Sequence, residues 1–363
     1  MQRLSRYTLD AAFAANEWSS MPVADASDSR LEMLTRWVTE DLGFSDSLIA
    51  PASADASFRR YFRVTRGSDT YIVMDAPPEK EDVAPFLKVG RILSDIGVNA
   101  PAVLARDNAR GLLLLSDLGT RVYLDALRDE AAADPLYGDA LRALREIQTA
   151  DAALGAQLPH YDRALLMREM DLMPEWFLQR HLGLTPTAAH RQMLNQLFEF
   201  LSQSAAEQPA VIVHRDYHSR NLLVTAERNP GILDFQDAVW GPVTYDVASL
   251  LKDCYIAWPA ARVRDWVLGF RESLLERGFA AGSAAQFLRW FDLIGLQRHI
   301  KVLGIFARLF YRDGKPGYLK DLPRVLDYTR AAAAAYAETA PFAQFLDADV
   351  EARFAEAQAR VAP

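Results

Sequence analysis

The sequence V-I-V-H-R-D-Y-H-S-R-N-L-L-V at residues 211–224, followed by G-I-L-D-F-Q-D at 231–237, decides the fold of this chain. It contains three short apolar runs that are rich in Val, Ile and Leu and that favour β-strands, at 211–213, 222–224 and 231–233. A turn signal, Arg-Asn-Pro-Gly at 228–231, separates the last two runs. We therefore expect a hairpin that brings the residues before and after it together.

Three oxygen-bearing side chains lie beside these predicted strands: Asp216, Asn221 and Asp234. Four residues separate Asp216 from Asn221, which is the spacing of the kinase catalytic loop H-R-D-x-x-x-x-N. Phosphoryl transfer needs Mg²⁺, in-line positioning and a group that receives the proton of the nucleophile. Mg²⁺ prefers oxygen ligands. We predict that all three are catalytic, with Asp216 as general base or hydroxyl-orienting group and with Asn221 and Asp234 as metal ligands. Any one of them alone would more often be a turn former.

Composition narrows the class of protein. The chain has 363 residues, of which 50% are hydrophobic and 24% charged, so it is long enough for two domains. Its net charge of −8 and the lack of a basic face disfavour a nucleic-acid partner. The single Cys254 rules out a disulfide framework and fits a reducing compartment. No apolar run of membrane-spanning length and no secretory signal are present, so we expect no membrane partner and a cytoplasmic location.

The order of predicted elements indicates an α+β protein. Residues 1–28 have no sustained periodicity, and we interpret them as a loosely held extension. A small antiparallel β lobe is expected over 29–118, made of a helix after residue 29, strands at 58–65, 70–75, 101–106 and 110–115, and a helix at 81–96. From residue 119 to 363 the pattern is mostly helical, with segments at 120–129, 134–152, 162–182, 186–207, 246–256, 259–277, 283–312 and 322–337.

The catalytic stretch and the β lobe resemble the aminoglycoside phosphotransferase and choline-kinase-like family. The resemblance covers roughly residues 50–310, and its motifs are H-R-D-Y-H-S-R-N-L-L at 214–223, I-L-D-F-Q-D at 232–237 and G-P-V-T-Y-D-V-A-S-L-L at 241–251. It implies a bilobal protein-kinase-like fold in which Asp246 braces the catalytic loop, with ATP and Mg²⁺ as cofactors. The segments S-F-R-R-Y-F-R-V, V-M-D-A-P-P and D-F-Q-D-A-V-W-G-P are most similar to the anomeric N-acetylmuramate and N-acetylglucosamine kinases of bacterial cell-wall recycling. That similarity implies phosphorylation of the C1 hydroxyl of a small amino sugar, and we expect a monomer.

The nucleotide side departs from the kinase pattern. The strand at 70–76 has no Lys where kinases hold the α/β-phosphates. The small, polar segment 53–57 lies where a Gly-rich loop would cover the phosphates, although a plain loop fits it equally well. The residues that we predict to bind the nucleotide are Ser57, Phe58, Arg59, Arg60, Leu115, Asp117 and Leu118. By the resemblance, Leu115–Leu118 would bind adenine through backbone groups.

The acceptor side needs directional hydrogen-bonding groups for an amino sugar. The predicted substrate-binding residues are Asp216, His218, Gln236, Asp237, Glu169, Arg298 and His299. Arg298 could pair with a lactyl carboxylate, although helix-surface polarity or a satisfied core histidine is the simpler interpretation of Arg298 and His299. Two alternatives stay open: a kinase of the same fold for an aminoglycoside, choline or homoserine, and a catalytically idle kinase-like binding protein. The absent Lys favours the second of these, whereas the complete set of Asp216, Asn221 and Asp234 argues against it.

Overall fold

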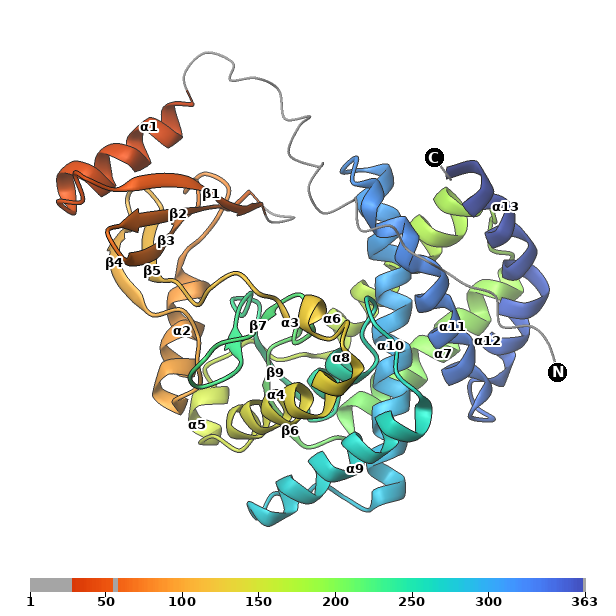
Figure 1. Cartoon of the computed structure of the whole chain (residues 1–363). Helices are drawn as coiled ribbons and strands as arrows, with labels where there is room; N and C mark the ends of the chain where they lie inside the picture. The colour runs from red at the N-terminus through yellow and green to blue at the C-terminus, as the bar shows by residue number, and fades with distance from the viewer. Residues whose placement is uncertain (1–27, 55–57, 362–363) are drawn as a thin grey trace. The chain divides into compact units, whose positions relative to one another are not determined.

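A computed structural model describes residues 28–54 and 58–361 of the chain. They divide into two compact units: one reaches Glu81 and includes Ala105–Leu114, and the other comprises Asp82–Leu104 and the chain from Leu115 onward (Figure 1). The predicted extension, apart from residue 28, and Ser57 lie outside the described residues. This division assigns residues 82–104 to the second unit, whereas the predicted small lobe runs over 29–118, so the lobe boundary stays a prediction.

The first unit is built on a five-stranded sheet with the order β1-β2-β3-β5-β4. Its strands are β1 (Leu48–Ala54), β2 (Arg60–Arg66), β3 (Asp69–Asp75), β4 (Val103–Asp107) and β5 (Leu112–Ser116). Helix α1 (Ser29–Arg36) and the π-helix η1 (Trp37–Asp41) pack on the sheet. The core between them contains Leu34, Trp37, Val38, Phe62, Val64, Val73, Leu112 and Leu114. Asp28 caps α1 by accepting a hydrogen bond from the Leu31 N–H.

Strand β1 was not predicted. It pairs antiparallel with β2 from Leu48 opposite Thr65 onward, and the register shifts between Pro51 and Ser53. Proline is tolerated there because β1 is the edge of the sheet, where one row of N–H groups needs no partner. Part of the segment 53–57, which we interpreted as a loop, is therefore strand.

The second unit is mostly helical. Its α-helices are α2 (Ala84–Ile96), α3 (Tyr123–Ala126), α4 (Ala133–Gln148), α5 (Ala152–Gly155), α6 (Arg163–Met170), α7 (Ala188–Ala206), α8 (Tyr245–Leu251), α9 (Ala260–Glu276), α10 (Ala284–Tyr311), α11 (Leu322–Ala334), α12 (Ala340–Phe345) and α13 (Glu351–Val361). Short 3₁₀ helices occur at η2 (Glu130–Ala132) and η4 (Pro316–Asp321), and π-helices at η3 (Met173–His181) and η5 (Leu346–Val350). Helix α10 is 28 residues long, and α7, α8, α11 and η3 all pack against it. Within the described ranges, no helix is long and apolar enough to cross a membrane.

Two small strand pairs position the polar residues of the catalytic stretch. β6 (Ala210–Val213) pairs with β9 (Val239–Pro242), and β7 (Leu222–Leu223) pairs with β8 (Gly231–Ile232). The second pair is the hairpin expected from the sequence. β9 was not predicted, because its Gly241 and Pro242 are residues that usually weaken or end a strand.

Candidate active site

Two buried carboxylates hold the loop that follows β6. Asp246, on α8, accepts hydrogen bonds from the backbone N–H groups of His214 at 2.6 Å and Arg215 at 3.0 Å. Asp253 accepts one from the N–H of Ser219 at 2.9 Å. Burial raises the pKa of Asp246 to about 7, although the two backbone donors act in the opposite direction. Arg215 has a φ of 76°, a left-handed conformation that is uncommon outside glycine, so this loop depends on these anchors.

The hairpin brings Asn221 and Asp234 together. Asn221 Nδ2 donates to the backbone oxygen of Asp216 at 3.0 Å and lies 3.3 Å from Asp234 Oδ2. Asp234 has a φ of 61°, and its Oδ1 accepts a hydrogen bond from Gln236 Nε2 at 2.7 Å. Because the Asn221 amide nitrogen faces these acceptors, its Oδ1 is the atom that can serve a cation.

This pair suits Mg²⁺ better than a metal that needs a cage of protein ligands. It offers oxygen donors, and Mg²⁺ usually takes one or two such protein ligands together with water and phosphate oxygens. Among the residues that the structure describes, no group of three or more His, Cys, Asp or Glu side chains could hold a metal ion. The roles of Asn221 and Asp234 as metal ligands stay predictions.

Positive charge surrounds Asp216, which is half-buried. Burial opposes its ionisation, but the charges of Lys301, His218, Arg215 and Arg298 outweigh that effect and lower the pKa of the Asp216 carboxyl. The group is therefore a carboxylate at neutral pH. A carboxylate can orient a hydroxyl group and accept its proton, as the sequence predicts for this position.

Glu169 has internal partners that the sequence did not indicate. Its side chain is buried, and Oε1 lies 2.5 Å from Arg215 Nη2 and 2.9 Å from Lys301 Nζ. The hydroxyl of Tyr161 donates to Oε2, and Gln297 Nε2 lies 3.4 Å from the same oxygen. These contacts tie α6 and α10 to the catalytic loop. Contact between Glu169 and a sugar stays a prediction.

Arg298 and His299 are neighbours on α10 with different surroundings. Arg298 is buried, and its Nη1 lies 3.5 Å from the sulfur of Cys254. The His299 ring stacks on Tyr328 at 4.9 Å, and its Nε2 lies 2.9 Å from the backbone oxygen of Lys252. Burial lowers the pKa of His299 to about 3, so the ring is neutral and its Nε2–H donates to that oxygen. Of the two residues, only Arg298 contributes to lowering the pKa of Asp216. Contact of either residue with a sugar stays a prediction.

The remaining acceptor-side candidates surround the loop. Asp237 is exposed, and its backbone oxygen accepts a hydrogen bond from Arg215 Nη1 at 3.3 Å. His218 is half-buried, with its ring edge-on to Tyr255. Gln236 is held by Asp234, as described above. Their contacts with a substrate stay predictions.

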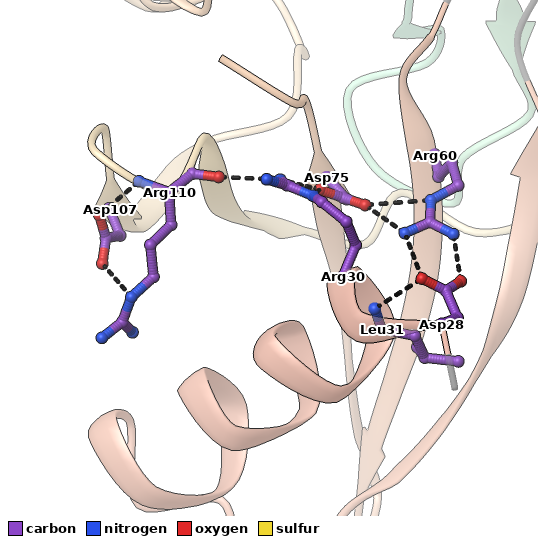
Figure 2. Close-up of polar contacts among 7 residues, drawn as sticks. All are labelled: Asp28, Arg30, Leu31, Arg60, Asp75, Asp107 and Arg110. Carbon is purple, nitrogen blue, oxygen red and sulfur yellow. Dashed lines mark hydrogen bonds and ion pairs between the residues drawn. The ribbon is translucent and has the colours of Figure 1, made fainter. Parts of the chain in front are cut away.

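Arg60 is held by carboxylates in the first unit. It lies opposite Asp75 in the β2–β3 register, and its Nη2 is 2.6 Å from Asp75 Oδ2. Asp75 also binds Arg30, whereas Arg60 reaches Asp28 as well (Figure 2). Arg30 in turn donates to the backbone oxygen of Arg110 at 2.8 Å. Arg60 therefore has carboxylate partners in this structure, and its predicted contact with phosphate is untested.

The other predicted nucleotide-binding residues have few described partners. The N–H of Phe58 donates to Glu81 at 2.9 Å, and Phe58 itself is 59% exposed. In the second unit Leu115 is buried, Leu118 is half-buried, and Asp117 accepts a hydrogen bond from the N–H of Gly119 at 2.9 Å. Arg59 has interacting partners, and Ser57 lies outside the described residues. Nucleotide binding by this set stays a prediction.

Comparison with known proteins identifies relatives over most of the chain. A model of the phosphotransferase enzyme family, APH, matches residues 49–291. A protein of Pseudomonas aeruginosa named N-acetylmuramate/N-acetylglucosamine kinase is 45% identical over 332 residues, which are 88% of this chain and 97% of that protein. A protein of the same name from Neisseria meningitidis serogroup B is 43% identical over 313 residues, covering 85% of this chain and 92% of its own.

Solved structures agree on the fold. An ethanolamine kinase from Plasmodium vivax superposes with a TM-score of 0.63 at 12% identity, covering 86% of this chain and 91% of its own. The ADP-bound aminoglycoside phosphotransferase APH(2'')-Ib superposes with a TM-score of 0.56 at 16% identity. The match covers 83% of this chain and 97% of that protein. At such identities the likeness establishes the fold alone. The α+β, bilobal kinase-like fold expected from the sequence is thereby confirmed.

Proposed function

This chain belongs to the phosphotransferase enzyme family, and we propose that it transfers the γ-phosphoryl group of ATP to the anomeric C1 hydroxyl of N-acetylmuramate and N-acetylglucosamine. The relatives that are 43% and 45% identical over most of the chain carry the names of these two acceptors. The observation that carries the chemistry is the convergence of Asp216, Asn221 and Asp234 on one loop and hairpin, with 3.3 Å between the last two. An idle binding protein would not need this set of oxygen donors.

Each residue of the catalytic loop and hairpin has a separate role in the proposed reaction. Asp216 orients the C1 hydroxyl and accepts its proton as the hydroxyl oxygen bonds to the γ-phosphorus and the bond to the β-phosphate oxygen breaks, which releases ADP. Asn221 and Asp234 would hold Mg²⁺, which neutralises charge on the phosphate oxygens when it is bound. Asp246 keeps Asp216 in position through the backbone of the loop. The low pKa of Asp216 suits a loose transition state, in which the proton is removed late.

The product would be an amino-sugar 1-phosphate, which suits a role in peptidoglycan recycling in the cytoplasm. We propose that the protein acts as a monomer on a small-molecule substrate and needs neither nucleic acid nor membrane. Aminoglycosides and ethanolamine are acceptors named for proteins that are only 16% and 12% identical to this chain, respectively. They are therefore less favoured than the amino sugars named for the nearer relatives.

The test is a kinase assay with a panel of acceptors. Purified protein with ATP and Mg²⁺ should phosphorylate both amino sugars, and phosphorus–proton coupling in NMR spectra should assign the new phosphate to C1. Choline, homoserine and an aminoglycoside serve as alternative acceptors. Phosphate on another hydroxyl, or transfer only to one of the alternatives, would refute the assignment, and ATP binding without transfer to any acceptor would favour the idle protein.

A further inference from the structure

We propose that Arg220 recognises the carboxylate of an acidic amino sugar, namely the lactyl carboxylate of N-acetylmuramate. This inference rests on the proposed function and specifies how the same site would treat its two acceptors. N-Acetylglucosamine lacks the lactyl ether and so carries no carboxylate. A cation that contacts this group would bind one acceptor more tightly than the other.

Arg220 lies within the catalytic loop, immediately before Asn221, and is exposed. Its guanidinium stands over the ring of Tyr255 at 4.7 Å and over that of Tyr318 at 5.9 Å. Phe306 joins these rings, with centroids 6.2 Å from Tyr255 and 5.2 Å from Tyr318. We call Tyr255, Phe306 and Tyr318 the aromatic wall. They come from the segment after α8, from α10 and from η4.

The aromatic wall prepares Arg220 for a planar anion. Cation–π contact holds a guanidinium through its face, so the in-plane N–H groups that do not bond the Tyr255 hydroxyl stay available for a carboxylate. Such pairs can be bidentate, which makes them selective as well as strong. Tyr255 and Tyr318 are only half-buried, so their rings also offer apolar surface to the face of a sugar.

The other cationic side chains that act on Asp216 already have partners or are buried. Arg215 and Lys301 share the carboxylate of Glu169, and Arg298 is buried against Cys254. Neither Arg220 nor Arg298 has a carboxylate within ion-pair distance among the described residues, but Arg298 is buried, whereas Arg220 is exposed and is acted on by the charge of Asp321. Arg220 is thus the cation of this loop that can offer its charge to a ligand without breaking a buried ion pair.

His218 gives a second, independent indication of a ligand. Its Nδ1 is buried and has no hydrogen-bond partner among the described residues, and its ring is edge-on to Tyr255 at 5.5 Å. Buried polar atoms are nearly always paired, so this nitrogen needs a partner that the described residues do not provide. A ring nitrogen of histidine can form a hydrogen bond with a hydroxyl or amide group.

The experiment compares kcat/KM for the two acceptors. Arg220→Gln should lower the ratio of N-acetylmuramate to N-acetylglucosamine about 10- to 100-fold, because a charge-assisted pair contributes about this much. Arg220→Lys keeps the charge but loses the planar fork, so its ratio should lie between those of the wild type and Arg220→Gln. The control is Arg264→Gln, an exposed arginine on α9, which removes the same charge and should leave the ratio unchanged.

A modified substrate tests the same contact on the wild-type protein, so the result does not depend on whether a variant folds. The methyl ester of N-acetylmuramate lacks the negative charge, so the wild type should use it less well than the acid by a similar factor. Arg220→Gln should hardly distinguish ester from acid. If the variant loses activity equally on both sugars, Arg220 acts on the transferring phosphoryl group or on the loop, and the proposal is overturned.

An unchanged ratio together with equal use of ester and acid would also overturn the proposal. Failure of the wild type to phosphorylate either sugar would refute the proposed function instead. Calorimetric titration of the wild type and Arg220→Gln with the acid and its ester would then still report whether this arginine binds the carboxylate.

Discussion

Replacing Lys301 with methionine should destabilise the helical unit, and the structure allows the cost to be worked out. Lys301 Nζ and Glu169 Oε1 are 2.9 Å apart, and both side chains are nearly inaccessible to water. Removing one partner of a buried pair costs about 3–5 kcal/mol, because the remaining charge is left uncompensated. Glu169 keeps Arg215 at 2.5 Å, so we expect the lower end, about 3 kcal/mol.

Urea denaturation followed by tryptophan fluorescence measures this cost. With a slope of about 2–3 kcal/mol per molar urea, a loss of 3 kcal/mol moves the midpoint down by about 1 M. Methionine has a similar length and adds no cavity, so the change reports the charge. Lys320→Met, at an exposed position, is the matched control and should change the free energy of unfolding by less than about 0.5 kcal/mol.

A double-mutant cycle with Glu169→Gln separates the pair from its surroundings. If Lys301 and Glu169 stabilise each other directly, the double variant should be more stable than the sum of the two losses predicts, by more than about 1 kcal/mol. Strict additivity, or a loss below about 1 kcal/mol for Lys301→Met, would contradict the assignment of a buried ion pair.

Other changes test the catalytic loop and its surroundings. Asp216→Asn should lower kcat by about 10²- to 10⁴-fold while the dissociation constant for ATP, measured by calorimetry, stays within about threefold, and near-normal turnover would remove Asp216 from the mechanism. Asp234→Asn should raise the Mg²⁺ concentration for half-maximal activity, since an amide attracts the cation less than a carboxylate, whereas Glu227→Gln, at an exposed position, should not. Burial lowers the pKa of His299 from 6.5 to about 3, so between these values the unfolded chain binds a proton that the folded chain does not. The free energy of unfolding should therefore fall as the pH drops below 6.5, by up to about 1.4 kcal/mol per unit from this residue, and His299→Gln should show a shallower dependence in urea titrations at pH 5 and 7.

The catalytic loop could be predicted because its information is local. The spacing of Asp216 and Asn221 and the turn signal before β8 are read within about twenty residues, and the hairpin that they predict is present. Strand β9 was missed because its glycine and proline contradict strand propensity. Pairing with β6 outweighs that propensity, and pairing depends on residues distant in sequence.

The buried ion pairs were missed for the same reason. Glu169 lies on α6 and Lys301 on α10, and hydrophobic periodicity in the sequence does not predict that the two side chains form an ion pair. One signal was available: Lys301 interrupts a long apolar helix, and lysine is almost never buried without a partner. That signal indicates a buried anion but not which one. Arg60 and Asp75 are likewise adjacent only because the β2–β3 register sets them opposite each other.

The anchors of the catalytic loop, Asp246, Asp253 and the Glu169 cluster, all belong to one of the two units. The loop that carries Asp216 is therefore held by residues of its own unit. Under the proposal for Arg220, a change of acceptor would be engineered at Tyr255, Phe306 and Tyr318, which belong to this same unit.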